Sequence, residues 1–359
     1  DRVVREVKAR AADVVVVALL HAYADARHEQ QLAAALQRVL PTVPVVCSSA
    51  VLPEIREYER TATTVAEGYA RPAVAHYMAG LQARLASRGW PAPHVMTSAG
   101  GTVSADDAAH HAASLALSGP AGGVAGAAAF ARSHGIGQAL TVDVGGTSAD
   151  VGLILDGSPL LERGGSVAGV PIALPRVLIE TVAAGGGSII HVDAGGALQV
   201  GPRSAGAVPG PAAFGQGVLP TLTDAHVVLG HIVEGDWSGG VHVSRTRAMA
   251  ALQPIAAQLG TTVERIAMAA CDTVDASMAR ALRRVSVERG VDPRAGALIA
   301  FGGGGPLHGC ALAERLGLTE VLIPPSAGVL SAVGLAAAPR RRTIVRNAFG
   351  PATALTGER

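Results

Sequence analysis

The stretch that most constrains the fold is LTVDVGGTSADVGLIL, Leu140–Leu155, in which two apolar runs flank a glycine-rich loop. The runs Leu140–Val144 and Val151–Leu155 are rich in β-branched residues and short enough to be buried strands. Asp156 and Gly157 follow the second run and form a pair typical of tight turns. The stretch therefore predicts a β-hairpin closed by GGTSAD, whereas a Walker or Rossmann loop would run into a helix.

The loop of this hairpin has the composition of an anion-binding site. Gly145 and Gly146 leave backbone N–H groups unshielded, and Thr147 and Ser148 add hydroxyl donors. Asp143 ends the first strand beside the loop, where a carboxylate would repel phosphate directly but would hold Mg²⁺ through water. An ordinary hairpin with a glycine bulge is the alternative that the spacing alone leaves open.

A second candidate ligand loop follows the predicted buried strand Ala297–Phe301. Bare backbone at the carboxyl end of a strand lets a planar ligand lie against it, and the next helix, Leu307–Leu316, adds positive potential for phosphate at its N-terminus. His308 in the first turn is a candidate for facing this ligand, and a simple connector is the alternative. The loop consists of Pro306 and four glycines, Gly302, Gly303, Gly304 and Gly305.

Two predicted helices carry almost no side-chain bulk on one face. Leu117–Arg132 contains Gly122, Gly123 and Gly126 among alanines, and Ser326–Leu335 is a second run of small residues. The backbone cost of glycine in a helix needs a reason, and close approach of another helix supplies one. We expect the two helices to pack together, either at a crossing point between two lobes or as simple tight packing.

The start of the chain is predicted to form a βαβ unit. Val14–Leu19 and Val43–Cys47 are apolar strands on either side of a helix, Arg27–Leu40. Such units are usually parallel and right-handed.

Two long helical segments follow. Glu54–Trp90 is mostly helical, and Pro72 is predicted to start a new helix because proline is tolerated in a first turn. The mixed charges before and including Arg60 are predicted to form a solvated face. Thr261–Arg289 has apolar residues at helical spacing and is predicted to be a strongly amphipathic helix.

A few polar residues are weaker site candidates. Ser188 follows the glycines of a second strand–loop–strand pattern, and Asp150 closes the GGTSAD loop. Asp224, His226 and His231 are close enough in sequence to suggest a metal site, although a helix cap followed by surface histidines is the simpler interpretation.

Composition narrows the class of protein. The 359 residues are 49% hydrophobic but only 3% aromatic, so small side chains pack the core of an expected two domains or one large one. The net charge is +1 and the basic run Arg340–Arg342 is short, which gives no indication of nucleic-acid binding. Cys47, Cys271 and Cys310 lack metal or redox spacing and are expected to be buried residues of a reduced, cytoplasmic protein. We expect no membrane segment, because no apolar run reaches ~18–20 residues, and no signal peptide.

Taken together, colinear motifs across nearly the whole chain resemble the hydantoinase A/oxoprolinase family. Each motif is weak by itself, but their shared order is highly specific. They are EIREYERTATT (54–64), SGPAGGVAGA (118–127), DVGGTSAD (143–150), AAGGGSI (183–189), VGPRSAGAVPGPA (200–212), TDA (223–225), MARALRRVSVERGVDPR (278–294), FGGGGPLHG (301–309) and PPSAGVLSAVGL (324–335).

The resemblance implies an α/β fold of the actin-like or sugar-kinase-like ATPases, in which two lobes surround a nucleotide cleft. Residues 1–116 would be the remainder of an incomplete first lobe. Residues 117–325 would be the second lobe, with DVGGTSAD as its second phosphate loop and FGGGG as its adenosine loop. Residues 326–359 would return to the first lobe as a crossing helix. ATP and Mg²⁺ are the implied cofactors.

Family members use ATP to open cyclic amides such as hydantoins and 5-oxoproline, and close relatives are ATP-using subunits of ketone carboxylases. Phosphorylating the amide oxygen makes it a leaving group, and Mg²⁺ and loop amides stabilise the transferring phosphoryl group. The resemblance therefore implies the A-type subunit of an ATP-dependent cyclic amidase with a B-type partner subunit. A ketone carboxylase subunit and a non-catalytic nucleotide-binding remnant are the alternatives.

The resemblance also assigns roles to residues. Asp143 and Asp150 are the catalytic candidates, and Asp143 is also the magnesium ligand. Ser188, Asp224 and His308 are candidates for the substrate side. The nucleotide-binding candidates are Gly145, Gly146, Thr147, Ser148, Gly302, Gly303, Gly304 and Gly305.

The chain departs from the family pattern in several places. The family's first phosphate loop is missing and the sequence begins at Asp1 without an initiator methionine, so we expect a fragment that binds nucleotide weakly by itself. Leu178 stands where an acidic residue is common, Ala213 and Phe214 where Cys-Tyr is common, and His226 where Asn is common. These changes leave the substrate, and any second metal near Asp224, open.

Overall fold

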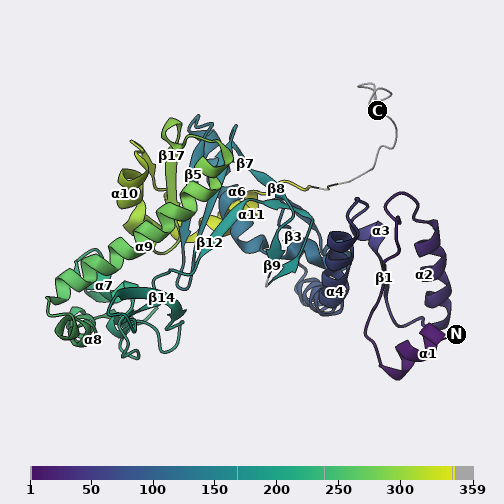
Figure 1. Ribbon diagram of the computed structural model, residues 1–359, viewed down its shortest axis with the longest axis horizontal. Helices are drawn as coiled ribbons and strands as arrows, with labels where there is room; N and C mark the ends of the chain where they lie inside the picture. The colour runs from purple at the N-terminus through teal and green to yellow at the C-terminus, as the bar shows by residue number, and fades with distance from the viewer. Residues whose placement is uncertain (1, 168, 238, 342, 344–359) are drawn as a thin grey trace. The chain divides into compact units, whose positions relative to one another are not determined.

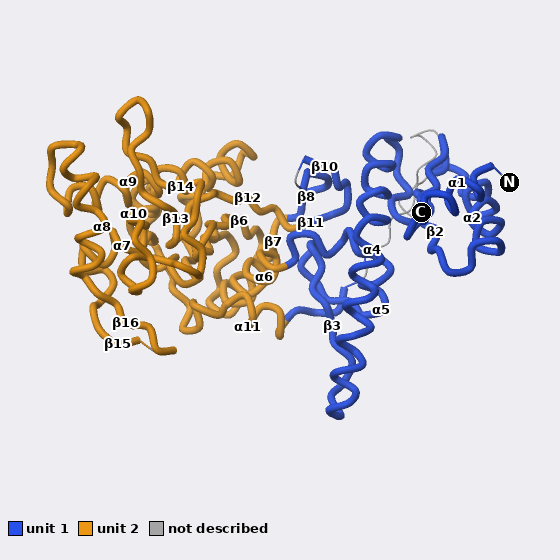
Figure 2. The backbone as a smooth tube through the Cα atoms, turned by 90° about the horizontal axis from the view of Figure 1, so that it is seen from below, with its two compact units in different colours: residues 1–118, 161–176, 338–359 blue, residues 119–160, 177–337 orange. Residues whose placement is uncertain are grey.

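The computed structural model describes residues 2–167, 169–237, 239–341 and 343, and it divides into two compact units (Figure 2). Unit 1 consists of residues 1–118, 161–176 and 338–359, and unit 2 of residues 119–160 and 177–337. The sequence predicted divisions after residues 116 and 325. By their contacts, residues 326–337 belong to unit 2. The end of the predicted crossing segment, namely residue 342 and residues 344–359, lies outside the described residues.

Unit 1 is a small parallel βαβ element beside a long helix and several short strands (Figure 1). Its elements are α1 (Arg2–Ala9), β1 (Val15–Val17), α2 (Arg27–Val39), β2 (Val45–Cys47), α3 (Ser48–Val51), α4 (Glu57–Ala86), β3 (His94–Met96), β4 (Thr102–Ser104), α5 (Ala105–His110), the 3₁₀ turn η1 (Ala112–Leu115), β8 (Leu161–Arg163), β9 (Ser166–Val167), β10 (Val170–Pro171) and β11 (Pro175–Val177).

The βαβ prediction is confirmed, because β1 pairs in parallel with β2 and α2 connects them. The prediction of a new helix at Pro72 is wrong, since α4 runs through it as one helix of 30 residues. Contacts hold α4 on both sides of the proline: Arg60 donates to Ser48 before it, and Gln82 donates to Asp106 after it.

Arg60 also contradicts the predicted solvated face, because its side chain is fully buried. Its guanidinium pairs with Glu57 and donates to the Leu19 carbonyl at 2.9 Å and the Ser48 hydroxyl at 3.1 Å. A buried guanidinium is tolerated when several acceptors surround it. The Arg60 side chain therefore links α4 to the residues that follow β1 and β2.

Unit 2 is built on a six-stranded mixed sheet with the order β12-β6-β5-β17-β18, where β7 adds to β6. Its elements are α6 (Ser118–Ser133), β5 (Ala139–Val144), β6 (Ala149–Leu155), β7 (Ser158–Pro159), β12 (Ile179–Val182), β13 (Ser188–Val192), β14 (Leu198–Ser204), η2 (Ala212–Phe214), α7 (Leu222–Val228), β15 (Gly235–Trp237), β16 (Val241–Val243), α8 (Arg245–Gln258), α9 (Val263–Val285), η3 (Val287–Arg289), η4 (Pro293–Ala295), β17 (Ala297–Phe301), α10 (Gly305–Leu316), β18 (Val321–Leu322), η5 (Ala327–Val329) and α11 (Leu330–Ala337).

The predicted hairpin is confirmed as β5 and β6, which pair antiparallel, while β17 lies parallel to β5 on its other side. All five residues of β17 are buried, as its continuous apolar sequence predicts for a central parallel strand. Helix α9 packs against β6 and β12, and α10 packs against β17 and β5 (Figure 1). The sheet and these helices enclose the main core.

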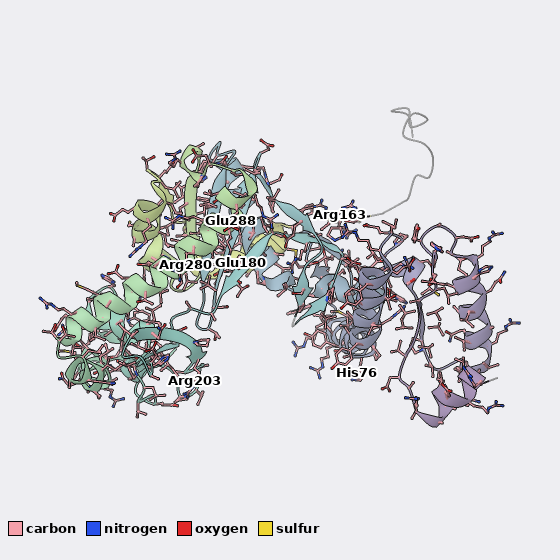
Figure 3. All side chains as sticks on the ribbon, viewed as in Figure 1. His76, Arg163, Glu180, Arg203, Arg280 and Glu288 are labelled. Atoms are coloured by element: carbon pink, nitrogen blue, oxygen red, sulfur yellow. The ribbon has the colours of Figure 1, made fainter. Side chains whose placement is uncertain are left out.

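Helix α9 follows the predicted amphipathic pattern. Ile266, Ala270, Val274 and Met278 are all buried, and Thr262 caps the N-terminus by accepting a hydrogen bond from Arg265. The exposed side chains on its outer face include Arg280, which is labelled in Figure 3. One apolar stripe thus joins α9 to the sheet.

The two small-residue helices, α6 and α11, pack together as predicted. A Cβ placed on Gly126 would lie 2.8 Å from the carbonyl oxygen of Leu330 and 3.1 Å from the Cα of Gly334. Gly334 in turn meets the backbone of Gly122 and Gly126. No side chain fits between the two backbones at this point, so glycine is required on both helices.

The cysteines only partly match the sequence prediction. All three are free thiols: Cys271 is buried, Cys47 is half-buried, and Cys310 is exposed. The exposure of Cys310 contradicts the prediction, because α10 buries the face that carries His308, Gly309 and Leu312 instead. Of the helices in the described part of the chain, none combines the length and apolar character needed to cross a bilayer.

Candidate functional site

The hairpin loop between β5 and β6 presents a set of free amide donors. The Gly145 N–H donates to the Ser148 carbonyl at 3.0 Å, which closes the loop. Among the described residues, the amides of Gly146, Thr147 and Ser148 donate to no other group. Residues 145–147 are exposed. Successive unpaired N–H groups on an exposed loop suit an anion with several oxygens.

A second glycine loop, residues 183–187, lies directly against the first. The amides of Gly186 and Gly187 donate to the carbonyls of Gly145 and Gly146 at 3.0 and 2.6 Å. A Cβ on Gly185 would lie 2.7 Å from the amide nitrogens of both Thr147 and Ser148. Only glycine therefore leaves room beside these donors. The sequence predicted this glycine loop, but no pattern in the sequence indicated that it would lie against the hairpin loop.

Two carboxylates face each other at the mouth of the hairpin loop. Asp143 and Asp150 are cross-strand partners in β5 and β6. Asp143 accepts a hydrogen bond from the Ser331 hydroxyl at 3.3 Å, and Asp150 accepts one from the Thr181 hydroxyl at 2.5 Å. Burial raises the pKa of Asp143, and the charge of Asp150 raises it further. Burial also raises the pKa of Asp150, against the hydrogen bond from Thr181.

The donor set of this site fits Mg²⁺ with a phosphate ligand. Within the described residues, no group of three or more His, Cys, Asp or Glu side chains is arranged to hold a metal ion alone. Mg²⁺ instead binds through one or two carboxylates together with water and substrate phosphates. A cation beside Asp143 and Asp150 would also relieve the repulsion between the two carboxylates.

The glycine turn after β17 lies beside the hairpin loop, because β17 is the neighbour of β5. Asp143 pairs in register with Phe301, so Gly302 follows at the same sheet edge. Gly302 has a φ of +81°, and a Cβ there would overlap the Asp143 carboxylate. The Gly304 amide donates to the Val144 carbonyl at 2.9 Å.

The middle of this turn is open. Gly303 is exposed, and a Cβ built on it would meet nothing within 4 Å. Gly305 begins α10, so the helix N-terminus follows immediately. The structure thus brings Asp143, the hairpin loop and the turn Gly302–Gly305 together at one end of the sheet.

The three substrate-side candidates are all buried, and their roles stay predictions. Ser188 accepts a hydrogen bond from the Gly185 amide at 2.9 Å and so supports the second glycine loop. Asp224 accepts from the amides of Ala212, Ala213 and Thr221 and from the Thr221 hydroxyl. The Asp224 amide in turn donates to the Thr221 hydroxyl at 3.4 Å, which completes a helix capping box, and the bonds from Ala212 and Ala213 hold η2.

His308 is 1% exposed and lies in a buried histidine cluster rather than on the open side of the turn. Its Nδ1 is 2.6 Å from an Asp275 oxygen, and its Nε2 is 3.3 Å from Nε2 of His226. The Nδ1 atoms of His226 and His231 are 3.0 Å apart. The metal site suggested for Asp224, His226 and His231 is wrong, because no such group among the described residues has a metal-binding arrangement.

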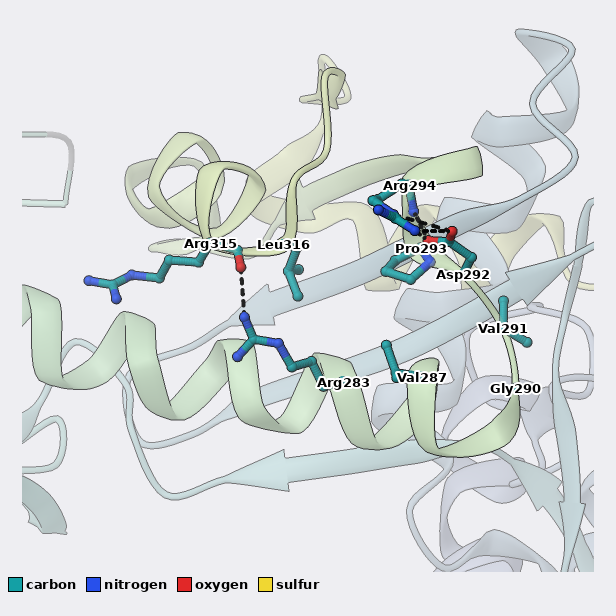
Figure 4. Close-up of a pocket in the computed structure, with 9 residues that line it drawn as sticks. All are labelled: Arg283, Val287, Gly290, Val291, Asp292, Pro293, Arg294, Arg315 and Leu316. Carbon is teal, nitrogen blue, oxygen red and sulfur yellow. Dashed lines mark hydrogen bonds and ion pairs between the residues drawn. The ribbon is translucent and has the colours of Figure 1, made fainter.

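A cavity of about 410 Å³ lies elsewhere in unit 2, between the ends of α9 and α10 (Figure 4). Its guanidinium groups are already engaged. Arg283 donates to the Arg315 carbonyl at 2.7 Å, Arg294 pairs with Asp292 at 2.8 Å, and Arg315 pairs with Asp272 at 2.7 Å. None of the glycine loops lines this cavity, so it is separate from the candidate nucleotide site.

Comparison with a solved structure defines the class of fold. The chain matches the crystal structure of ATP-dependent caprolactamase from Pseudomonas jessenii with a TM-score of 0.82 and 36% identity. The match covers 93% of this chain and 49% of the other. At this similarity the two share the same α/β fold.

The chain belongs to the hydantoinase/oxoprolinase family, whose family model matches residues 60–344. It is 40% identical to caprolactamase subunit alpha of Pseudomonas jessenii, over 89% of this chain and 47% of that protein. It is 33% identical to the acetone carboxylase beta subunit of Xanthobacter autotrophicus, over 93% of this chain and 48% of that protein. The chain thus spans about half the length of these relatives, and the resemblance seen in its motifs is confirmed.

Proposed function

We propose that this chain carries the nucleotide-binding part of an ATP-dependent cyclic amidase of hydantoinase or 5-oxoprolinase type. The observation that carries the proposal is the meeting of three features at one sheet edge. These are the free amides of the hairpin loop, the paired carboxylates Asp143 and Asp150, and the open glycine turn at Gly303. A relative named as a caprolactamase subunit supports cyclic-amide chemistry.

In the proposed site, each group has a distinct task. The amides of Gly146, Thr147 and Ser148 hold phosphate oxygens, and Gly302–Gly305 accommodate the adenosine. Asp143, oriented by Ser331, holds Mg²⁺, and Asp150 is the second catalytic carboxylate. Mg·ATP would supply the phosphoryl group that is transferred to the amide oxygen and activates the carbonyl carbon. Water then adds to that carbon, the ring C–N bond breaks as the nitrogen takes up a proton, and hydrolysis of the resulting acyl phosphate by a second water releases the carboxylate and phosphate.

We extend the proposal to the whole protein by analogy with its family. The complete fold is proposed to be of the actin-like type, with two lobes around a nucleotide cleft. A B-type subunit is proposed as partner, because relatives are named as subunits of multi-subunit enzymes. Three free thiols support a reducing, cytoplasmic location.

A second candidate function is the ATP-using subunit of a ketone carboxylase, supported by the 33% identity to an acetone carboxylase subunit. It predicts ATP turnover that depends on bicarbonate and on a ketone, without ring opening. A nucleotide-binding remnant predicts binding of ATP without turnover under either condition.

The first test is calorimetric titration of Mg·ATP into the chain and into an Asp143→Ala variant. We expect the variant to bind at least about tenfold more weakly, a loss of ~1.4 kcal/mol. Asp236→Ala, which removes an exposed carboxylate from β15, serves as the matched control and should bind like the wild type. Equal affinity of wild type and Asp143→Ala would contradict the assignment of the loop.

A further inference from the structure

The outer surface of α4 is exposed but carries no charge. From Tyr58 to Ala83, none of the exposed residues of this helix is Asp, Glu, Lys or Arg. The charged residues in the same stretch are all buried or half-buried, namely Glu59, Arg60, Glu67 and Arg71. A surface helix ordinarily turns charged side chains to water. We call this exposed surface, from Tyr58 to Ala83, the tyrosine face of α4.

The large side chains of the tyrosine face are mostly aromatic. Only 3% of the chain is aromatic, yet three of its four tyrosines lie here. Tyr58, Tyr69 and Tyr77 are 71, 87 and 63% exposed, and Val65 between them is 51% exposed. His76, which is labelled in Figure 3, is exposed on the same helix. Tyrosines without neighbouring charges are the composition of the centre of a protein–protein interface.

The opposite face of α4 holds the helix to its own unit. Thr63 and Gly68 are buried, and a Cβ placed on Gly68 would lie 2.6 Å from a side-chain carbon of Val16. Glu67, also on that side, accepts a hydrogen bond from the Ala113 amide at 2.7 Å. The tyrosine face therefore takes no part in the core of unit 1, and substitutions on it should leave the fold intact.

The spacing along the tyrosine face is that of a seam between two helices. Its residues recur in alternating steps of four and three, which keep one narrow stripe facing a partner helix. They are Tyr58, Ala62, Val65, Tyr69, Pro72 and His76. The natural occupant of the tyrosine face is therefore another helix.

The sizes of the side chains make the tyrosine face complementary to itself. In an antiparallel pair of α4 helices with a two-fold axis at Tyr69, residues equally far before and after Tyr69 face each other. Tyr58 then meets Gly80 of the second copy, and Val65 meets Ala73 of the second copy. A Cβ placed on Gly80 has nothing within 4 Å, so the space for the tyrosine ring is open. Large side chains thus face small ones, and Tyr69 faces its own counterpart.

The charges at the two ends of α4 favour the same antiparallel arrangement. The first turn of the helix carries Glu57 and Glu59, and the last turn carries Arg84. An antiparallel pair brings the basic end of each copy towards the acidic end of the other, whereas a parallel pair would bring like charges together.

The area of the tyrosine face reaches what a specific interface needs. A buried tyrosine contributes 150–250 Å², so the exposed parts of the three tyrosines amount to roughly 900 Å² over two copies. Val65 and the small residues between the tyrosines bring the total to about 1,200 Å², the lower end of stable interfaces.

We propose that this chain forms a two-fold symmetric dimer in which the tyrosine faces of two α4 helices pack antiparallel, with Tyr69 at the axis. The occupant of the face is a second copy of the same chain. This inference does not depend on the proposed nucleotide site, which lies in unit 2.

The test is sedimentation equilibrium of the whole chain over a series of concentrations. We expect the mass to rise from the 36.0 kDa of one chain towards twice that value as the concentration increases through the micromolar range, where interfaces of small area bind. A chain that keeps the mass of one copy up to about 100 µM would overturn the proposal, because it would exclude an affinity in that range.

Tyr69→Arg is the informative variant, because it places two guanidinium groups together at the two-fold axis. It should raise the dissociation constant at least about tenfold, while Tyr69→Phe keeps the ring and should dimerise like the wild type. Trp90→Arg changes an aromatic residue that is 59% exposed but lies outside α4, so it is the matched control and should also dimerise. Circular dichroism checks that all variants are folded. A dimer that survives Tyr69→Arg would overturn the role of the tyrosine face.

Crosslinking with a short bis-maleimide tests the antiparallel direction. The background is Cys310→Ser, which removes the exposed native thiol and should itself give no crosslinked dimer. Tyr69→Cys should then give a crosslinked dimer, because the two thiols meet at the axis. Tyr58→Cys should not, because the two copies of residue 58 would be about 33 Å apart along the helix pair at 1.5 Å per residue. Crosslinking through position 58 but not through position 69 would contradict the proposed axis, and equal crosslinking at both positions would indicate a parallel pair instead.

Discussion

At the scale of single residues, the candidate site depends on glycines that carry no side chain as much as on the groups that side chains supply. Asp143 contributes the carboxylate, but Gly185, Gly302 and Gly303 contribute space around it and around the loop amides. Gly302 combines a positive φ with direct contact to Asp143, so it meets both a conformational and a steric requirement. The candidate hairpin loop is thus shaped by glycines from three separate segments.

Gly185→Ala tests this steric argument. The new Cβ would lie 2.7 Å from three backbone atoms, the Gly145 oxygen and the amide nitrogens of Thr147 and Ser148. Because these are backbone atoms, the two loops must move apart, and we expect Mg·ATP affinity to fall at least about tenfold. Titration calorimetry measures the effect. Gly137→Ala, where the Cβ meets nothing within 4 Å, should leave affinity unchanged, and equal binding by all three proteins would refute the contact.

At the scale of elements, the contact between α6 and α11 connects packing to the site. The backbones approach at Gly126 and Gly334, and this approach brings Ser331 of α11 to the Asp143 carboxylate. Gly123 of α6 contributes as well, because a Cβ there would lie 2.9 Å from the Ser331 hydroxyl oxygen. A substitution at the contact between α6 and α11 is therefore expected to affect both the stability of the fold and the hydrogen bond from Ser331 to Asp143.

Gly334→Ala should lower the free energy of unfolding by ~1–3 kcal/mol, the usual cost of overpacking a tight interior. The added methyl group would overlap the backbone of Gly122 and Gly126. Urea unfolding followed by circular dichroism measures the loss. Gly119→Ala on α6 is the control, because its Cβ meets nothing within 4 Å and alanine favours helix by ~1 kcal/mol. A variant at Gly334 as stable as this control would exclude the close packing.

At the scale of the whole molecule, a buried histidine contributes to how stability depends on pH. Burial, together with the nearby rings of His308 and His231, lowers the pKa of His226 to about 3. Cys271 also lies 3.9 Å from its ring, and Asp275 faces it through His308. The folded protein therefore keeps His226 neutral at a pH where the unfolded chain would protonate it.

We expect the free energy of unfolding to fall as pH drops from about 6.5, the ordinary histidine pKa, towards the folded value. The unfolded state binds the extra proton in this window, so the loss approaches ~1.4 kcal/mol per pH unit. His226→Gln should flatten the slope in urea unfolding between pH 7.5 and 5. Asp143, Asp150 and Asp224, with pKa values raised by burial, act in the opposite sense but equally in both proteins. Identical slopes would rule out the contribution of His226.

Several parts of this fold were predictable because their signals are local. The β5–β6 hairpin, the strand before Gly302, and the apolar face of α9 follow from periodicity and turn residues that lie next to each other in the sequence. Pro72 and Arg60 were misread for the opposite reason. Their local preferences favour a helix start and a solvated face, but the contacts of α4 with Ser48, Leu19 and Asp106 override them.

Local patterns in the sequence were enough to predict the family, the α/β class, the glycine loops and the pairing of two small-residue helices. These follow from hydrophobic periodicity and from glycine's freedom of approach, which act over a few residues. The three-dimensional structure was needed to show that Ser331 reaches Asp143, 188 positions away, that Gly185 lies beside the loop amides, and that the Glu67 carboxylate is buried with one oxygen unpaired. Such contacts depend on how distant segments pack, and no local pattern in the chain encodes the distance between them.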